Sequence, residues 1–200
     1  SVAWVTERKD VLYGMFFLAA MYQYIRTKTN PTLWRYVLIY LFFGLSLLSK
    51  IQAVALPLVM VAIDFLLDEK FELKSVINKW PYFLISFLWG VLGIVVLGSE
   101  GSLDTNDVTY PFWQRIFIGS FSYLVYLVKV VIPYELSPLY PYPPSMPAYF
   151  YPTIVMVPIV GYLAWMSYTK GWKVFGFALF FFTFNIIFLL QVLGAGQGFI

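Results

Sequence analysis

The densest group of residues able to bind anions or transfer protons is Glu7-Arg8-Lys9-Asp10, immediately before an apolar run of the chain. One interpretation is a solvated helix start, in which Asp10 caps the helix and complements its positive end. The other is a site in which Arg8 or Lys9 holds an anionic head group while Glu7 or Asp10 contacts a polar acceptor. The residue types alone fit both interpretations.

Three further charged residues stand in otherwise apolar sequence. Lys50 is the only charged residue between Arg35 and Asp64, and its ammonium either snorkels to the membrane interface or binds an anion. Lys129 either faces a polar cavity or marks an interfacial helix face. Asp64 falls on the side of the membrane opposite these candidates, so we expect a structural role for it.

Residues 134–144 form a segment rich in proline and tyrosine. The prolines hold the backbone near polyproline II, so little conformational entropy remains to be lost on binding. On such a frame Tyr140 and Tyr142 would stack on a sugar ring or close over a lipid head group. The alternative is an aromatic belt at the membrane interface.

The composition of the whole chain indicates the environment of these candidate residues. Of the 200 residues, 61% are hydrophobic and 12% charged, against about 25% charged in a soluble domain, and the mean hydropathy is +0.78. This composition predicts an integral membrane protein. The chain has no cysteine or histidine, which excludes disulfides, thiolate or imidazole zinc sites and catalytic triads with a histidine base. A net charge of +3, spread over many loops, gives no reason to expect a nucleic-acid partner.

The apolar runs predict an all-α bundle of about six spanning helices, at roughly twenty residues each. The predicted spans are 11–25, 33–48, 53–67, 80–97, 150–168 and 174–193. A break at Ser49-Lys50-Ile51-Gln52 separates the second from the third, and Pro57 is expected in the first turns of the third. The run 112–132 is interrupted by polar residues, and we expect it to be an interfacial or re-entrant helix instead of a span.

The orientation follows from the lysines and arginines, because short cytoplasmic loops collect positive charge. The loops predicted to be cytoplasmic carry Arg26, Lys28 and Arg35, then Lys70, Lys74 and Lys79, then Lys170 and Lys173. The other candidates then face outward: Glu7 to Asp10, Lys50, Lys129 and the proline-tyrosine segment. A full crossing at 112–132 would place the last basic loop outside, which is why an interfacial helix is preferred there.

Several stretches together resemble a known family. They are Ser-Val-Ala-Trp-Val-Thr-Glu-Arg-Lys-Asp-Val-Leu, then Leu-Ser-Leu-Leu-Ser-Lys followed by Ala-Leu-Pro-Leu-Val and Asp64, then Leu-Ser-Pro-Leu-Tyr-Pro. In this order they look like the membrane part of bacterial tetratricopeptide-repeat glycosyltransferases. Those enzymes are similar to the eukaryotic transmembrane and tetratricopeptide-repeat-containing protein O-mannosyltransferases. In the family's Ser-Lys motif a proline commonly follows, whereas here Ile51 follows Lys50.

The resemblance implies a multi-spanning transferase with the C-type glycosyltransferase fold. It would move a sugar from a polyprenyl-phosphate donor to a hydroxyl acceptor, on a protein Ser/Thr or on a glycan, at the outer or lumenal face. The membrane would be the bacterial inner membrane or, in a eukaryote, the endoplasmic reticulum. No cofactor is implied, and the involvement of a divalent metal stays open.

The resemblance, together with the chemistry of transfer from a lipid phosphate, suggests roles for the candidate residues. The main catalytic base is expected upstream of Ser1, with Glu7 and Asp10 as helpers. Arg8, Lys9, Lys50 and Lys129 are expected to bind the donor phosphate, and Tyr140 and Tyr142 to cover the sugar or lipid head. Residues 1–200 would then be an internal piece of one transmembrane domain, inactive alone, with the repeats beyond Ile200. The alternatives are a transporter or flippase of lipid-linked sugar and a structural membrane subunit.

Overall fold

Helices make up the whole regular structure of the described residues. The computed structural model describes residues 8–67, 73–99, 110–134 and 145–190, and no strand occurs in these ranges. The prediction of an all-α protein is therefore confirmed. The chain divides into two compact units, 1–93 and 94–200.

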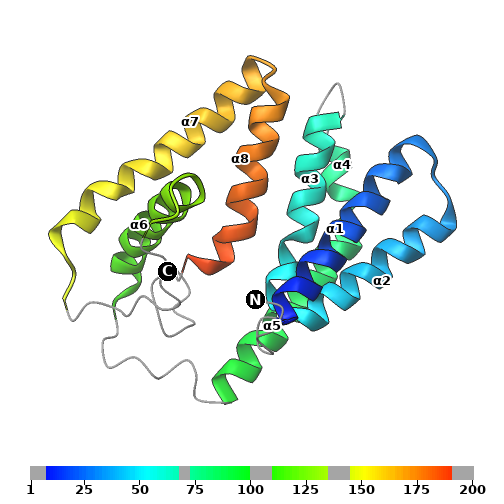
Figure 1. Cartoon of the computed structure of the whole chain (residues 1–200), viewed down its shortest axis with the longest axis horizontal. Helices are drawn as coiled ribbons and strands as arrows, with labels where there is room; N and C mark the ends of the chain where they lie inside the picture. Colours follow the sequence, from blue (N-terminus) through cyan, green and yellow to red (C-terminus); the bar gives the residue numbers. More distant parts are fainter. Residues whose placement is uncertain (1–7, 68–72, 100–109, 135–144, 191–200) are drawn as a thin grey trace. The chain divides into compact units, whose positions relative to one another are not determined.

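The first unit begins with two long helices, α1 (Arg8–Thr29) and α2 (Leu33–Ser49), which pack against each other as an antiparallel hairpin (Figure 1). Their facing sides carry the buried apolar residues of both helices. The fully buried Ser46 Oγ of α2 donates a hydrogen bond of 3.2 Å to the backbone oxygen of Tyr13 in α1. A small hydroxyl at this position lets the two helices approach closely and ties them together within the apolar contact.

Charged side chains complement both ends of α1. Asp10 lies in its first turn, and Arg26 and Lys28 lie in its last, so each charge opposes the partial charge of the nearby helix end. Arg35 of the next helix donates from one guanidinium nitrogen to the backbone oxygens of Arg26 and Asn30, at 2.6 Å each. The Arg26 oxygen also accepts from the Asn30 N–H at 3.1 Å, so Arg35 adds a side-chain tie between α2 and the end of α1.

The chain reverses direction at Lys50, as the sequence predicted. Lys50 is extended, with φ −156° and ψ 132°, and it separates α2 from a short 3₁₀ helix, η2 (Ile51–Ala55), which continues directly into α3 (Leu56–Leu67). Pro57 is the second residue of α3. A proline there removes no hydrogen bond that the helix needs.

Two further helices follow α3. The five-residue helix α4 (Leu73–Ile77) was not predicted, and it leads into α5 (Trp80–Ser99). Near the start of α5 the buried ring of Tyr82 stacks on Tyr40 of α2, with ring centroids 4.6 Å apart. This contact holds the beginning of α5 against the hairpin.

The second unit contains three longer helical segments. The helix α6 (Phe112–Val131) stands alone in sequence. The 3₁₀ helix η3 (Ala148–Val155) continues into α7 (Met156–Thr169), and α8 (Lys173–Ile186) continues into η4 (Ile187–Leu189). Contacts join α6 to η3 and α7 to α8.

A small aromatic core holds α6 against η3. Tyr110, Ile118 and Phe150 are buried together, and the ring of Phe121 stacks on Phe150 with centroids 4.2 Å apart. The segments α6 and η3 therefore form one packed body within this unit.

The turn between α7 and α8 has the geometry of a Schellman motif. Gly171 adopts a φ of +67°, which favours glycine because it has no side chain to clash. The Trp172 N–H bonds to the Ser167 oxygen at 2.9 Å, and the Gly171 N–H bonds to the Tyr168 oxygen at 3.4 Å. Both bonds satisfy carbonyls at the end of α7.

Two helical segments among the described residues are long and apolar enough to cross a membrane, Phe112–Val131 and Ala148–Thr169. Shorter apolar helices cover Leu33–Ser49, Ile51–Leu67, Trp80–Val96 and Lys173–Leu189. Large apolar side chains also point outward along the helices, Leu33 being 81% and Val174 75% exposed. Such surfaces are costly in water, so they favour contact with lipid.

Each of the six predicted spans overlaps a helical segment, although residues 191–193 of the last lie outside the described residues. The crossing of a membrane by all six stays a prediction. The segment predicted to be interfacial or re-entrant is one unbroken helix, α6. An unbroken helix does not re-enter by reversing its direction. Because α6 is also long and apolar enough to span, the interfacial placement rests on the charge pattern alone.

Candidate functional site

The structure brings together two candidate residues that are 40 positions apart in the sequence. Lys50 Nζ lies 2.5 Å from Asp10 Oδ1, and the two side chains are 29% and 33% exposed. The contact is an ion pair without the angular geometry of a hydrogen bond, although Asp10 Oδ1 itself is closed to solvent. The pair lies at the end of unit 1 where α1 begins and α2 ends.

The backbone around Lys50 explains how its side chain reaches Asp10. The Lys50 N–H donates to the Ser46 oxygen at 2.9 Å, and the Lys50 oxygen accepts from the Ala53 N–H at 3.1 Å. Lys50 is thus fixed on both sides, once by the end of α2 and once by the start of η2. Because the backbone of Lys50 is extended, its side chain projects from the turn between α2 and η2, where it contacts Asp10.

The remaining candidates of the first motif lie beside this pair. Arg8 and Lys9 begin α1 and are exposed, so their cationic groups are open to an anion at the same end of the unit. Glu7 lies outside the described residues. The structure therefore places three cations and one carboxylate at this end of α1: Arg8, Lys9, Lys50 and Asp10.

The other predicted site residues lie in the second half of the chain. Lys129 is half-buried in the last turn of α6, in the second unit. Tyr140 and Tyr142 lie outside the described residues. Their proposed roles toward the donor stay predictions.

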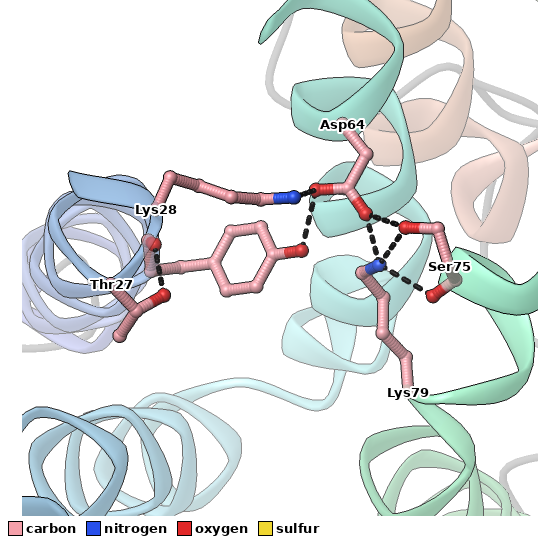
Figure 2. Close-up of polar contacts among 6 residues, drawn as sticks. Thr27, Lys28, Asp64, Ser75 and Lys79 are labelled. Carbon is pink, nitrogen blue, oxygen red and sulfur yellow. Dashed lines mark hydrogen bonds and ion pairs between the residues drawn. The ribbon is translucent and has the colours of Figure 1, made fainter. Parts of the chain in front are cut away.

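A second charged group, the Asp64 cluster, lies at the other end of unit 1 and consists of Tyr24, Lys28, Asp64, Ser75 and Lys79 (Figure 2). Asp64 Oδ1 accepts a hydrogen bond of 2.6 Å from the Tyr24 hydroxyl and lies 2.8 Å from Lys28 Nζ. Its Oδ2 contacts Lys79 Nζ and the Ser75 hydroxyl. The carboxylate is 1% exposed.

Three helices and the residue before a fourth contribute to the Asp64 cluster. Tyr24 and Lys28 come from α1, Asp64 from α3, and Ser75 from α4, while Lys79 directly precedes α5. Lys79 is 5% exposed, and its ammonium also donates to the backbone oxygen of Ser75 at 2.7 Å. A charge buried to this degree requires a partner of opposite sign, and Asp64 supplies it.

The chemistry of Asp64 is limited by these contacts. Two cations and two hydroxyls surround its carboxylate, which stabilise the charged form and occupy its lone pairs. A carboxylate held in this way is a poor general base, since abstraction of a proton needs a free oxygen facing the substrate. The geometry agrees with the structural role expected for Asp64.

Sequence reasoning did not identify the partners of Asp64. Lys28 and Lys79 were assigned only to the orientation of the loops, and Tyr24 and Ser75 were not singled out. One signal was present, because both lysines were predicted on the same side of the membrane as Asp64. A buried acid and two cations on one side should have suggested a contact.

No group of three or more acidic side chains able to hold a metal occurs in the part of the chain that the structure describes. No family model matches the chain, and neither a curated protein nor a solved structure matches it. Any assignment of function therefore depends on the motifs and on the geometry given above.

Proposed function

We propose that this chain is part of a multi-spanning membrane glycosyltransferase that takes a sugar from a polyprenyl-phosphate donor and transfers it to a hydroxyl acceptor. The observation that carries the proposal is the contact between Asp10 and Lys50. Each belongs to one of the motifs by which the sequence resembles the bacterial tetratricopeptide-repeat glycosyltransferases, and the fold brings the two motifs together at one end of the helices.

The charges at this end suit the proposed reaction. When the acceptor oxygen bonds to the sugar's anomeric carbon, the bond from that carbon to the donor phosphate breaks. The acceptor's proton passes to a carboxylate base upstream of Ser1, and the leaving phosphate gains negative charge. Cations placed in advance near this oxygen stabilise the transition state. Arg8, Lys9 and Lys50 are the described cations at this end of unit 1.

Asp10 gives Lys50 a defined position for this role. An ammonium has three N–H donors, so the contact with one carboxylate leaves donors for a phosphate oxygen. Lys50 is 29% exposed, which leaves it open to a ligand from the membrane surface. In this mechanism Asp10 holds the cation and does not itself accept the acceptor's proton.

The proposed arrangement in the membrane uses six spans, with α6 at the interface. The ends bearing Asp10 and Lys50 face the outer or lumenal side, and the basic loops face the cytoplasm. This orientation places the Asp10–Lys50 pair at the surface where a lipid-linked sugar presents its phosphate. The partners are the bilayer, the donor and a hydroxyl-bearing protein or glycan.

The test is sugar transfer by the full-length protein in lipid vesicles supplied with a polyprenyl-phosphate sugar. Arg8→Ala or Lys50→Ala should each lower turnover about a hundredfold, since loss of one donor to a developing oxyanion costs about 3 kcal/mol. Lys74→Ala is the matched control, because Lys74 is exposed on α4, and it should keep normal turnover. Normal turnover in both site variants, or movement of the donor across the bilayer without sugar transfer, would overturn the proposal.

A further inference from the structure

The two charged groups of unit 1 connect the same pair of chain segments at their opposite ends. The helix α1 carries Asp10 in its first turn and Lys28 in its last. The segment formed by η2 and α3 starts immediately after Lys50 and carries Asp64 near its end. The contacts Asp10–Lys50 and Lys28–Asp64 are 2.5 and 2.8 Å long, so the two segments run in the same direction with their charges in reverse order.

The 3₁₀ helix reduces the difference in length between the two segments. Lys28 follows Asp10 by 18 residues, which is about 27 Å along an α-helix. Asp64 follows Lys50 by 14 residues, which as α-helix would give only about 21 Å. The five residues of η2, at about 2.0 Å each, extend the segment by about 2.5 Å. The lysine side chains span the remainder.

Between the two contacts, Arg26 is the only other charged residue that either segment carries. The residues between Asp10 and Arg26 in α1 are all uncharged, and so are those between Lys50 and Asp64. A shift of the second segment along α1 by one helical turn moves it about 5.4 Å, which separates the ions at both ends at once. In the observed axial register both ion pairs form together, so each favours the same placement of the two segments.

The two ends differ in how firmly they are held. Asp64 is buried and has contacts to α1, to Ser75 of α4 and to Lys79, whereas the Asp10 and Lys50 side chains are about a third exposed. We propose that Tyr24, Lys28 and Asp64 are positioning residues: they fix the axial register of η2 and α3 on α1, and thereby place Lys50 against Asp10 at the far end. This inference deepens the proposed function, since Lys50 is proposed there to meet the donor phosphate.

The experiment measures the position of Lys50 directly and needs no donor. The full-length protein in vesicles of neutral lipid is treated with a membrane-impermeant amine-acylating reagent, applied to both faces after permeabilisation. The rate of modification at Lys50 is then followed by mass spectrometry. An ion-paired ammonium reacts slowly with the reagent, so Asp10→Asn should raise the rate of modification at Lys50 several-fold. This rate is the reference for a Lys50 that has lost its ion pair. Lys129 in the second unit is an internal standard within each sample.

The decisive variant is the double substitution Tyr24→Phe with Lys28→Met, because methionine has no N–H donor for Asp64. It removes both contacts from α1 to Asp64 but leaves Asp64 neutralised by Lys79, so no unpaired charge is buried. Lys50 should then react several-fold faster, approaching the Asp10→Asn rate. Ser75→Ala is the matched control, because it removes a contact of Asp64 to α4 and none to α1; it should leave the rate unchanged. Lys28→Arg, which keeps the cation, should also behave as the unmodified protein.

Two outcomes overturn the inference. An unchanged rate at Lys50 in the double variant, with a raised rate in Asp10→Asn, would mean that the two ends are independent. A rate that Asp10→Asn does not alter would mean that the pair does not hold Lys50 in the membrane. Neither result depends on sugar transfer, so a failure of the proposed activity is recognised separately from a failure of the positioning.

Discussion

Replacing Asp64 with asparagine should destabilise unit 1 more than any other single substitution in the Asp64 cluster. The side chain of Asp64 is 1% exposed and that of Lys79 is 6% exposed, so the substitution leaves a buried ammonium without its counter-ion. The new amide can also turn an N–H donor toward this ammonium, which has only donors itself. Breaking a buried ion pair by removing one partner costs about 3 to 5 kcal/mol, and we expect a loss of this size.

Removing the lysine of this ion pair should destabilise unit 1 less than removing the acid. Lys79→Gln removes one cation, but Asp64 keeps the ammonium of Lys28 and the hydroxyls of Tyr24 and Ser75. The expected loss is about 2 kcal/mol, the usual contribution of a hydrogen bond to a charged group. The double variant Asp64→Asn with Lys79→Gln should be more stable than Asp64→Asn alone, because it removes the unpaired charge.

The measurement is reversible unfolding of the full-length protein in mixed micelles, with increasing fractions of a denaturing detergent. Two-state unfolding gives the free-energy difference for each variant, and the double-mutant cycle gives the coupling between Asp64 and Lys79. An Asp64→Asn variant as stable as Ser75→Ala, or a cycle without coupling, would refute the argument that Lys79 depends on Asp64.

Three further predictions concern other parts of the chain. Gly171→Ala should destabilise the turn after α7 by about 1 to 2 kcal/mol because of its positive φ, while Gly161→Ala, in an open part of α7, should be neutral or slightly stabilising; thermal unfolding compares the two. Tyr123→Phe removes a 3.0 Å hydrogen bond between α6 and α8 and should cost about 0.6 kcal/mol in the same assay, so a loss of several kcal/mol would contradict it. A single cysteine replacing Ser145 should react with an impermeant thiol reagent added from the outer side, whereas one replacing Lys74 should react only after permeabilisation. Labelling of Ser145→Cys only after permeabilisation would mean that α6 spans the membrane.

The positions of the helices could be predicted from the sequence because they follow the runs of apolar residues along the chain. The predicted spans 33–48 and 53–67 correspond to Leu33–Ser49 and Ile51–Leu67 in the structure. The first predicted span, 11–25, was shorter than the helix α1. The prediction counted only the apolar residues, whereas α1 includes the charged turns at both ends. Charged side chains end an apolar run, but they do not end a helix when they complement its dipole.

The short helix α4 was missed for a different reason. Its five residues, Leu-Lys-Ser-Val-Ile, are too few to show a helical period. An isolated helix of this length is also unstable in water, so its formation depends on tertiary contacts. Ser75 and the nearby Lys79 supply them, because both bind Asp64.

The sequence predicted the members of the candidate site and a common side of the membrane for them, which stays a prediction, but it did not predict their contact. The sequence placed Asp10 and Lys50 on one side, yet their pairing depends on the register of α1 against the segment after Lys50. We propose above that Asp64 fixes this register in part, and its partners come from α1, from α4 and from the residue before α5. No local pattern encodes a contact among residues so far apart, and an apolar helix face tolerates many registers equally well.

The Asp64 cluster also explains how two lysines can set orientation and still become neutralised. Lys28 and Lys79 lie in the loops whose lysines and arginines predict the cytoplasmic side, and that rule depends on the number of cations, with little influence from acids. In the predicted arrangement, orientation would be established as the spans insert, before α1, α3 and the start of α5 pack. Asp64 can then pair with both lysines in the folded unit without weakening the signal that oriented them. A single acid at the end of α3 thus allows an ammonium to be buried at a helix junction, where an unpaired charge would oppose packing.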